Sequence, residues 1–281
     1  MNELTYRGST ITLNYIEGPK NGLPLLLVHG NMSRWQAFLP IISDLSSDTH
    51  VFALDLRGHG KSSHATGTYM LQNHLHDVTS FIKEQIGSPV ILFGMSLGGM
   101  IGLMAAAHYP ELIRSIIIAD SPLTLETLRP IVESQKELGH RILHYLKTNQ
   151  INKVYEEMND NFSSESICMC DPDILVTTFD RYEEMIFGYN IEKLFPLIRC
   201  PILIMRGEEK LGSMITDNDM RVATALLPQL RQCRITGVGH SLLMSKEIVL
   251  ETVMCFLREQ INGNRGRTPL VPEVVYRGDR S

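Results

Sequence analysis

The chain has 281 residues, of which 43% are hydrophobic and 20% charged, and a formal net charge of −5 at pH 7. This composition is typical of a globular protein and excludes none of the ordinary enzyme folds; the length suits one domain, with or without an insertion. No stripe rich in lysine or arginine stands out, so we expect no nucleic-acid partner. No apolar run approaches the length of a membrane span, and the first residues lack the pattern of a signal peptide, so the expected location is the cytoplasm.

Predicted strands and helices alternate along most of the chain. A hairpin is predicted over residues 4–17. Helical spacing of apolar residues occurs at 71–86, 97–109 and 246–260. Continuously apolar runs, typical of strands buried on both faces of a parallel sheet, occur at 25–28, 50–54, 89–93, 115–119 and 201–205, with a weaker run at 231–235. The alternation predicts a doubly wound, mostly parallel α/β sheet.

One stretch interrupts this alternation with helices alone. Helical patterns at 125–146, 154–161 and 172–187 form an insertion between two predicted strands. Insertions often lie on functional loops, so we expect a cap over an active site; helices that merely pack elsewhere are the alternative. The expected organisation is a core of residues 1–121 and 196–261, a helical cap of residues 122–195 and a flexible tail of residues 262–281.

The strongest motif is Gly94-Met95-Ser96-Leu97-Gly98, which matches G-x-S-x-G between a predicted strand and a predicted helix. A sharp strand-to-helix turn strains the backbone of its central residue, and the two glycines remove side chains that would collide there. Ser96 would then lie at the helix N-terminus, where amide donors favour a developing anion. We expect Ser96 to be a nucleophile.

Two further loops supply the groups that acyl transfer needs. A tetrahedral oxyanion requires two donors already in place, and we expect these to be the backbone N–H groups of Leu97 and of Asn31, which follows Gly30 after the strand at 25–28. His240 lies in a glycine-rich loop after the last predicted strand. In the catalytic triads of doubly wound sheets, which consist of a serine, an acid and a histidine, the serine comes first in the chain and the histidine last. His240 is therefore the expected base.

Together these segments resemble the α/β-hydrolase family over residues 4 to about 260. Residues 55–62, DLRGHGKS, are similar to the family's D-x-R-G-x-G-x-S turn, and residues 96–113 are similar to its nucleophile helix and the link to the next strand. The strand-to-helix turn at Ser96, which we call the elbow, and the helix after it look most like those of small lactonases and esterases that hydrolyse enol-lactones and related compounds. The resemblance implies that residues near 121–195 form the cap and line the pocket for the acyl or alcohol group.

The triad acid departs from the family pattern. In the family an aspartate usually follows the strand predicted at 201–205, but this chain has Gly207-Glu208-Glu209-Lys210 there. Glu208 is one candidate, with Glu209 beside it, because the longer glutamate side chain can reach from an earlier position. Asp120, at the end of the preceding strand, is the other candidate. Geometry, not spacing, decides between them.

These residues predict a serine hydrolase that cleaves a small-molecule ester or lactone through an acyl-enzyme on Ser96. A carbon–carbon bond hydrolase or a cofactor-free perhydrolase would use the same serine and histidine, and a ligand receptor with little turnover is the alternative from another class. A serine at the elbow argues against epoxide hydrolase chemistry, which uses a carboxylate there. This mechanism needs no metal or organic cofactor, so we expect neither. Cys168 and Cys170 do not change this, because they lack a second Cys/His pair at zinc-site spacing.

Overall fold

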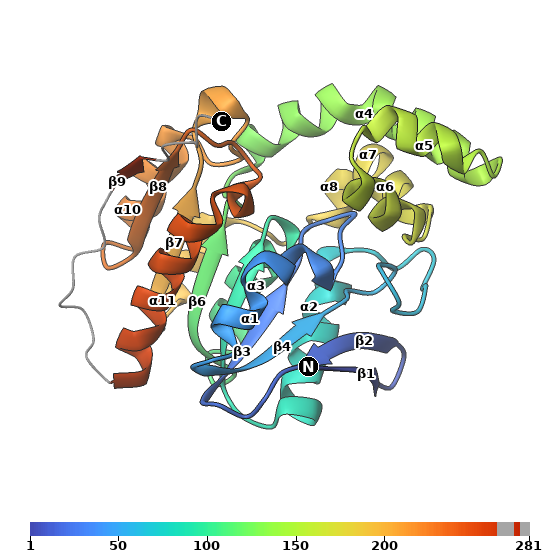
Figure 1. Ribbon diagram of the computed structural model, residues 1–281. Helices are drawn as coiled ribbons and strands as arrows, with labels where there is room; N and C mark the ends of the chain where they lie inside the picture. The colour runs from blue at the N-terminus through green and yellow to red at the C-terminus, as the bar shows by residue number, and fades with distance from the viewer. Residues whose placement is uncertain (263–272, 276–281) are drawn as a thin grey trace, which may run out of the picture.

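A computed structural model describes residues 1–262 and 273–275, and its centre is a nine-stranded sheet in the order β1-β2-β4-β3-β5-β6-β7-β8-β9 (Figure 1). The pairs β1–β2 and β2–β4 are antiparallel, and all other neighbours are parallel. The strands are β1 (Asn2–Arg7), β2 (Thr12–Glu17), β3 (Leu23–Val28), β4 (Thr49–Leu54), β5 (Val90–Met95), β6 (Ile113–Ala119), β7 (Ile202–Arg206), β8 (Arg231–Thr236) and β9 (Glu273–Val275).

The order of the parallel strands brings the loops after β3, β5 and β6 together at the carboxyl ends of these strands. The register pairs Val28 of β3 with Gly94 of β5, and Met95 of β5 with Ala119 of β6. The chain moves outward from β3 to β4 and then returns to β5 on the other side of β3, which makes this the point where the strand order reverses. Ligands of open α/β sheets bind outside the carboxyl ends of strands at such a point.

Helices cover both faces of the sheet, which explains why its strands are apolar throughout. Leu26 and Val28 pack into one core cluster, and Leu25 and Leu27 into another, because successive side chains of a strand point to opposite faces. One face carries α1 (Leu39–Leu45) and α11 (Lys246–Asn262), and the other carries α2 (Leu71–Phe81), α3 (Leu97–His108) and α10 (Asp217–Leu226) (Figure 1).

A helical insertion separates β6 from β7. It comprises α4 (Leu125–Lys147), α5 (Ile151–Met158), α6 (Asn161–Cys168), α7 (Asp173–Asp180), α8 (Tyr182–Met185) and α9 (Ile191–Leu194). Helices α4 to α7 share a small apolar cluster of their own, which includes Val154 and Phe179, whereas α9 packs with the core of the sheet. Figure 1 shows α4 to α8 gathered beyond one end of the sheet.

The structure confirms the predicted doubly wound α/β sheet and changes several details. The helix predicted at 71–86 passes at Ile82 into a π-helical turn that ends at Gly87. The helix predicted at 172–187 divides at Arg181, whose ψ of 26° leaves the helical range. The predicted tail lies largely outside the described residues, but Glu273–Val275 within it forms β9, which pairs with β8. No described helix combines the length and apolarity needed to cross a bilayer.

Candidate active site

Ser96 occupies the turn between β5 and α3 in a strained backbone conformation. Its φ is 49° and its ψ is −116°, values that residues with a side chain rarely adopt. A Cβ at Gly94 would lie 2.3 Å from the carbonyl oxygen of Gly98, and a Cβ at Gly98 would lie 2.1 Å from that of Val28. The turn can therefore form only with glycine at both positions, as the motif predicts. It places Ser96 at the first turn of α3.

His240 and Asp120 lie in contact at the same edge. Nδ1 of His240, in the loop after β8, is 2.8 Å from Oδ2 of Asp120, the residue that follows β6. The Asp120 side chain is fully buried, whereas that of His240 is 37% exposed. Asp120 has a φ of 45°, and its N–H donates to the carbonyl of Met205, so the pairing of β6 with β7 holds its position.

The loop after β7 surrounds the carboxylate of Asp120 with donors. The Ser213 hydroxyl donates to Oδ1, and the Met214 amide donates to Oδ2 at 2.8 Å. The same Met214 also contacts the serine, since the Ser96 hydroxyl donates to its Sδ at 3.8 Å. Met214 thus contacts both Asp120, a candidate acid, and Ser96, the candidate nucleophile. No hydrogen bond links Ser96 to His240 in this arrangement of the described residues; such contacts are often loose without substrate.

Glu208, the other candidate acid, has a different position. Its carboxylate accepts the N–H of Gly237 at 2.6 Å and pairs with Nζ of Lys210 at 2.8 Å. The hydrogen bond from Lys210 lowers the pKa of the Glu208 carboxyl. The expectation that Glu208 orients the histidine is therefore corrected: it braces the turn that leads into His240, and Asp120 reaches the ring. The Glu208 carboxylate accepts from the N–H of Gly237 and does not contact the His240 ring.

The loop after β3 lies against the elbow. A Cβ at Gly30 would be 3.1 Å from Cβ of Ser96, so the backbone of residues 30 and 31 passes close to the serine. Leu97 is the first residue of α3, and its N–H is one of those that an α-helix leaves without an internal partner. The predicted oxyanion donors, Asn31 and Leu97, thus belong to two segments that both come close to Ser96.

Two buried histidines, whose roles the sequence did not reveal, hold this loop. Nε2 of His29 accepts the N–H of Leu56, and Nε2 of His59 accepts that of Met32. Since an amide can only donate, both Nε2 atoms are unprotonated. Burial lowers the pKa of His29 to about 4 and that of His59 to about 3, so both rings stay neutral. The loop next to Ser96 is therefore anchored before any substrate arrives.

Contacts also tie the insertion to the loops around the elbow. Nδ2 of Asn31 donates to Oγ1 of Thr178 in α7 at 2.8 Å. The Tyr69 hydroxyl donates to Oδ2 of Asp171 at 2.7 Å, and the N–H of Asp171 donates to the carbonyl of Gly58. The segment around α7 is thus hydrogen-bonded to the loops that follow β3 and β4.

The chain is similar to known proteins both in sequence and in structure, and the sequence matches cover part of the chain. A 2-(acetamidomethylene)succinate hydrolase of Mesorhizobium japonicum is 36% identical over 139 residues, which cover 49% of each chain. Epoxide hydrolase 4 of Mus musculus is 31% identical over 119 residues, 41% of this chain and 33% of that protein. The aligned stretches thus span about half or less of the length of these curated relatives.

Solved structures match nearly the whole chain. A crystal structure of E-2-(acetamidomethylene)succinate hydrolase aligns with a TM-score of 0.73 at 24% identity, covering 92% of this chain and all of that one. The enol-lactonase of Burkholderia xenovorans LB400 aligns with a TM-score of 0.73 at 17% identity, covering 91% of this chain and all of that one. At these identities the likeness shows the fold alone. A family model described as the alpha/beta hydrolase fold matches residues 24–247. The chain therefore belongs to the α/β hydrolase fold family.

Proposed function

We propose that the protein is a serine hydrolase that cleaves a carboxylic ester or lactone of a small molecule through an acyl-enzyme on Ser96. The observation that carries the proposal is the 2.8 Å contact between Nδ1 of His240 and the fully buried carboxylate of Asp120, one residue beyond the strand that pairs with the elbow. A buried carboxylate at Nδ1 holds the imidazole in the tautomer that leaves Nε2 free to accept a proton.

In the proposed reaction the Ser96 hydroxyl rotates from Met214 toward His240. Its oxygen attacks the substrate carbonyl while its proton passes to Nε2 of His240. The N–H groups of Asn31 and Leu97 would receive the oxyanion, and the positive end of α3 adds to their effect. The protonated histidine then gives its proton to the leaving oxygen. Water, deprotonated by the same histidine, releases the acid and restores Ser96.

The helical insertion, residues 122–195, acts in this proposal as a cap over a core of residues 1–121 and 196–261. Two hydrogen bonds from the loops near Ser96 support this role: Asn31 donates to Thr178, and Tyr69 donates to Asp171. A cap shields the site from bulk solvent and shapes the pocket, as lids commonly do. In this proposal the substrate is a small molecule bound beneath the insertion.

A fluorophosphonate probe and a small aryl ester such as 4-nitrophenyl acetate test the proposal together. Ser96→Ala should abolish labelling and lower kcat/KM by about a thousandfold or more, the usual effect of removing a catalytic nucleophile. Ser134→Ala, which changes an exposed serine of α4, is the matched control and should behave as the wild type. Turnover by Ser96→Ala at the wild-type rate would refute the proposal.

The carbon–carbon bond hydrolase and perhydrolase alternatives share this serine and histidine. Labelling of Ser96 without aryl ester turnover would direct the search to those reactions. Ligand binding with neither labelling nor turnover would favour the receptor. The contact of the Ser96 hydroxyl with Met214 supports this receptor alternative, because it holds the hydroxyl in a hydrogen bond that does not involve His240.

A further inference from the structure

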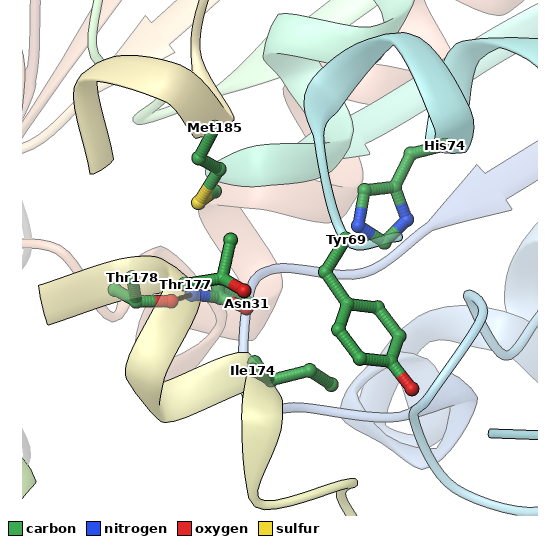
Figure 2. A pocket seen from close by; sticks show the side chains of 7 residues that line it. All are labelled: Asn31, Tyr69, His74, Ile174, Thr177, Thr178 and Met185. Atoms are coloured by element: carbon green, nitrogen blue, oxygen red, sulfur yellow. Dashed lines mark hydrogen bonds between the residues drawn. The ribbon is translucent and has the colours of Figure 1, made fainter. Parts of the chain in front are cut away.

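A small pocket lies between the loop at Asn31 and the helical insertion. Its lining comes from the loop after β3, from α2 and the segment before it, and from helices α7 and α8 (Figure 2). The residues that line it are Asn31, Tyr69, His74, Ile174, Thr177, Thr178 and Met185. Because Asn31 follows Gly30, where a Cβ would lie 3.1 Å from Cβ of Ser96, the pocket is close to the proposed reaction centre.

Two buried polar atoms of this lining have no hydrogen-bond partner among the described residues. They are Nδ1 of His74 and Oγ1 of Thr177, in residues that are 1% and 0% exposed. The backbone of Tyr69 lies near the His74 ring and favours its charged form, but gives Nδ1 no hydrogen bond of normal geometry. Buried polar groups are nearly always paired, because an unpaired one loses its hydration without compensation. Two such groups in one pocket indicate a partner that arrives from outside.

The other polar groups of the pocket are already engaged. The Tyr69 hydroxyl donates to Asp171 and accepts the N–H of Ala65. The Thr178 hydroxyl accepts from Nδ2 of Asn31. Hydrogen-bonding capacity is thus left over at His74 and Thr177, which come from the core and the insertion respectively.

The pocket carries no charged side chain to meet an ionised ligand. Burial lowers the pKa of His74 well below its usual value, so its ring is neutral. Arg57 pairs with Asp77, and Asp171 accepts from Tyr69 and Thr66, so these charged groups already have partners. A carboxylate or an ammonium group entering here would be desolvated without a counter-charge.

We propose that His74 and Thr177 form a specificity subsite for an uncharged hydroxyl of the substrate, an inference that rests on the proposed serine hydrolase. A hydroxyl both donates and accepts, so it pairs with a threonine hydroxyl and with either tautomer of a neutral imidazole. The lining side chains as they stand leave no water-sized space between them, so a hydroxyl that binds here displaces them slightly. The preferred substrates are therefore hydroxylated esters or lactones, and matching compounds with a methyl or a carboxylate in that place bind less well.

Matched ester pairs test this subsite. One pair varies the acyl side, 4-nitrophenyl 3-hydroxybutyrate against 4-nitrophenyl 3-methylbutyrate, and another varies the alcohol side, 2-hydroxypropyl butyrate against isobutyl butyrate. Rates are divided by the spontaneous alkaline rate of each ester. In at least one pair we expect the hydroxyl ester to have a kcat/KM about tenfold higher than its methyl partner, since a site built for a hydroxyl discriminates against the analogue lacking it. The carboxylate ester 4-nitrophenyl succinate should be the poorest.

Thr177→Val and His74→Leu should each lower this ratio to near one while changing the methyl ester by less than about threefold. Thr178→Val is the matched control on the same helix: its hydroxyl already serves Asn31, so the ratio should persist even where total activity falls. Equal rates for both members of every pair, or a preference that survives in both variants, would overturn the subsite.

Thermal unfolding supplies a readout that does not depend on activity. Thr177→Val replaces an unpaired hydroxyl by a methyl of the same shape, so Tm should stay or rise, whereas Thr178→Val should lower it because Asn31 loses its acceptor. A fall of several degrees in Thr177→Val would show that the hydroxyl is satisfied within the protein and would contradict the inference. Failure of the proposed function looks different, since neither member of any pair would then be hydrolysed through Ser96.

Discussion

Replacing Asp120 by asparagine should remove most of the activity without unfolding the protein. The carboxylate accepts from Nδ1 of His240, the Met214 amide and the Ser213 hydroxyl. An asparagine whose oxygen takes the place of Oδ2 keeps the first two hydrogen bonds, and its NH₂ group faces the Ser213 hydroxyl, which can rotate to accept. Geometry and tautomer are then conserved. The negative charge that stabilises the imidazolium during the reaction is lost.

The magnitude follows from the separation of the two charges. With N and O atoms at 2.8 Å, the charge centres lie about 4 Å apart, which corresponds to about 4 kcal/mol at an effective dielectric constant of about 20. Each 1.36 kcal/mol is a factor of ten in rate, so about 4 kcal/mol is about a thousandfold. The His240 side chain is 37% exposed, and solvent screening reduces this value. We expect Asp120→Asn to lower kcat by roughly 100- to 1000-fold with little change in KM.

Initial rates of 4-nitrophenyl acetate hydrolysis, with circular dichroism as a check on folding, measure this effect. Glu208→Gln is the matched control, because its amide oxygen can still accept from Gly237 and only the pairing with the exposed Lys210 is lost. Its activity should stay within about threefold of the wild type. A folded Asp120→Asn enzyme with more than about a tenth of wild-type activity would refute the assignment of the acid, and a large loss in Glu208→Gln would reverse it.

Three further predictions concern stability. Gly98→Ala places a Cβ 2.1 Å from the Val28 carbonyl oxygen and should lower the free energy of unfolding, measured with urea, by about 3 kcal/mol or more. Gly102→Ala on the same helix meets the flexible side chain of Leu92 and should lower it less. Equal losses in the two variants would contradict the backbone clash. Asp77→Asn leaves the buried Arg57 unpaired and should destabilise by about 3–5 kcal/mol, also measured with urea; a loss below about 1 kcal/mol would mean that solvent reaches the arginine. Stability should fall on acidification, because the unfolded chain binds protons at His29 and His59 from about pH 6.5 while the folded chain resists until about pH 4 and 3. His29 alone accounts for about 3 kcal/mol between pH 7 and 4, and a flat profile of unfolding free energy over that range would exclude buried neutral rings.

Local patterns in the sequence predict the sheet and the elbow because local rules govern them. A strand buried on both faces must be apolar at every position, and this is visible in the runs that became β3, β5 and β6. The turn at Ser96 needs glycine on both sides for steric reasons that involve its own strand and helix. The divided helix at Arg181 and the pairing of β9 with β8 escaped prediction, since neither leaves a periodic signal in the chain.

The sequence alone predicts the doubly wound sheet, the place of Ser96 in the turn between a strand and a helix, and the place of His240 in a loop after the last predicted strand. Only the tertiary structure decided which carboxylate meets the histidine, because Asp120 and Glu208 are both compatible with the chain order. The choice depends on where each backbone runs: β6 carries Asp120 into the buried edge beside Ser213 and Met214, while Gly237 and Lys210 hold Glu208. The pocket at His74 and Thr177 likewise depends on the tertiary structure, because these two residues line one pocket only when the insertion lies against the core.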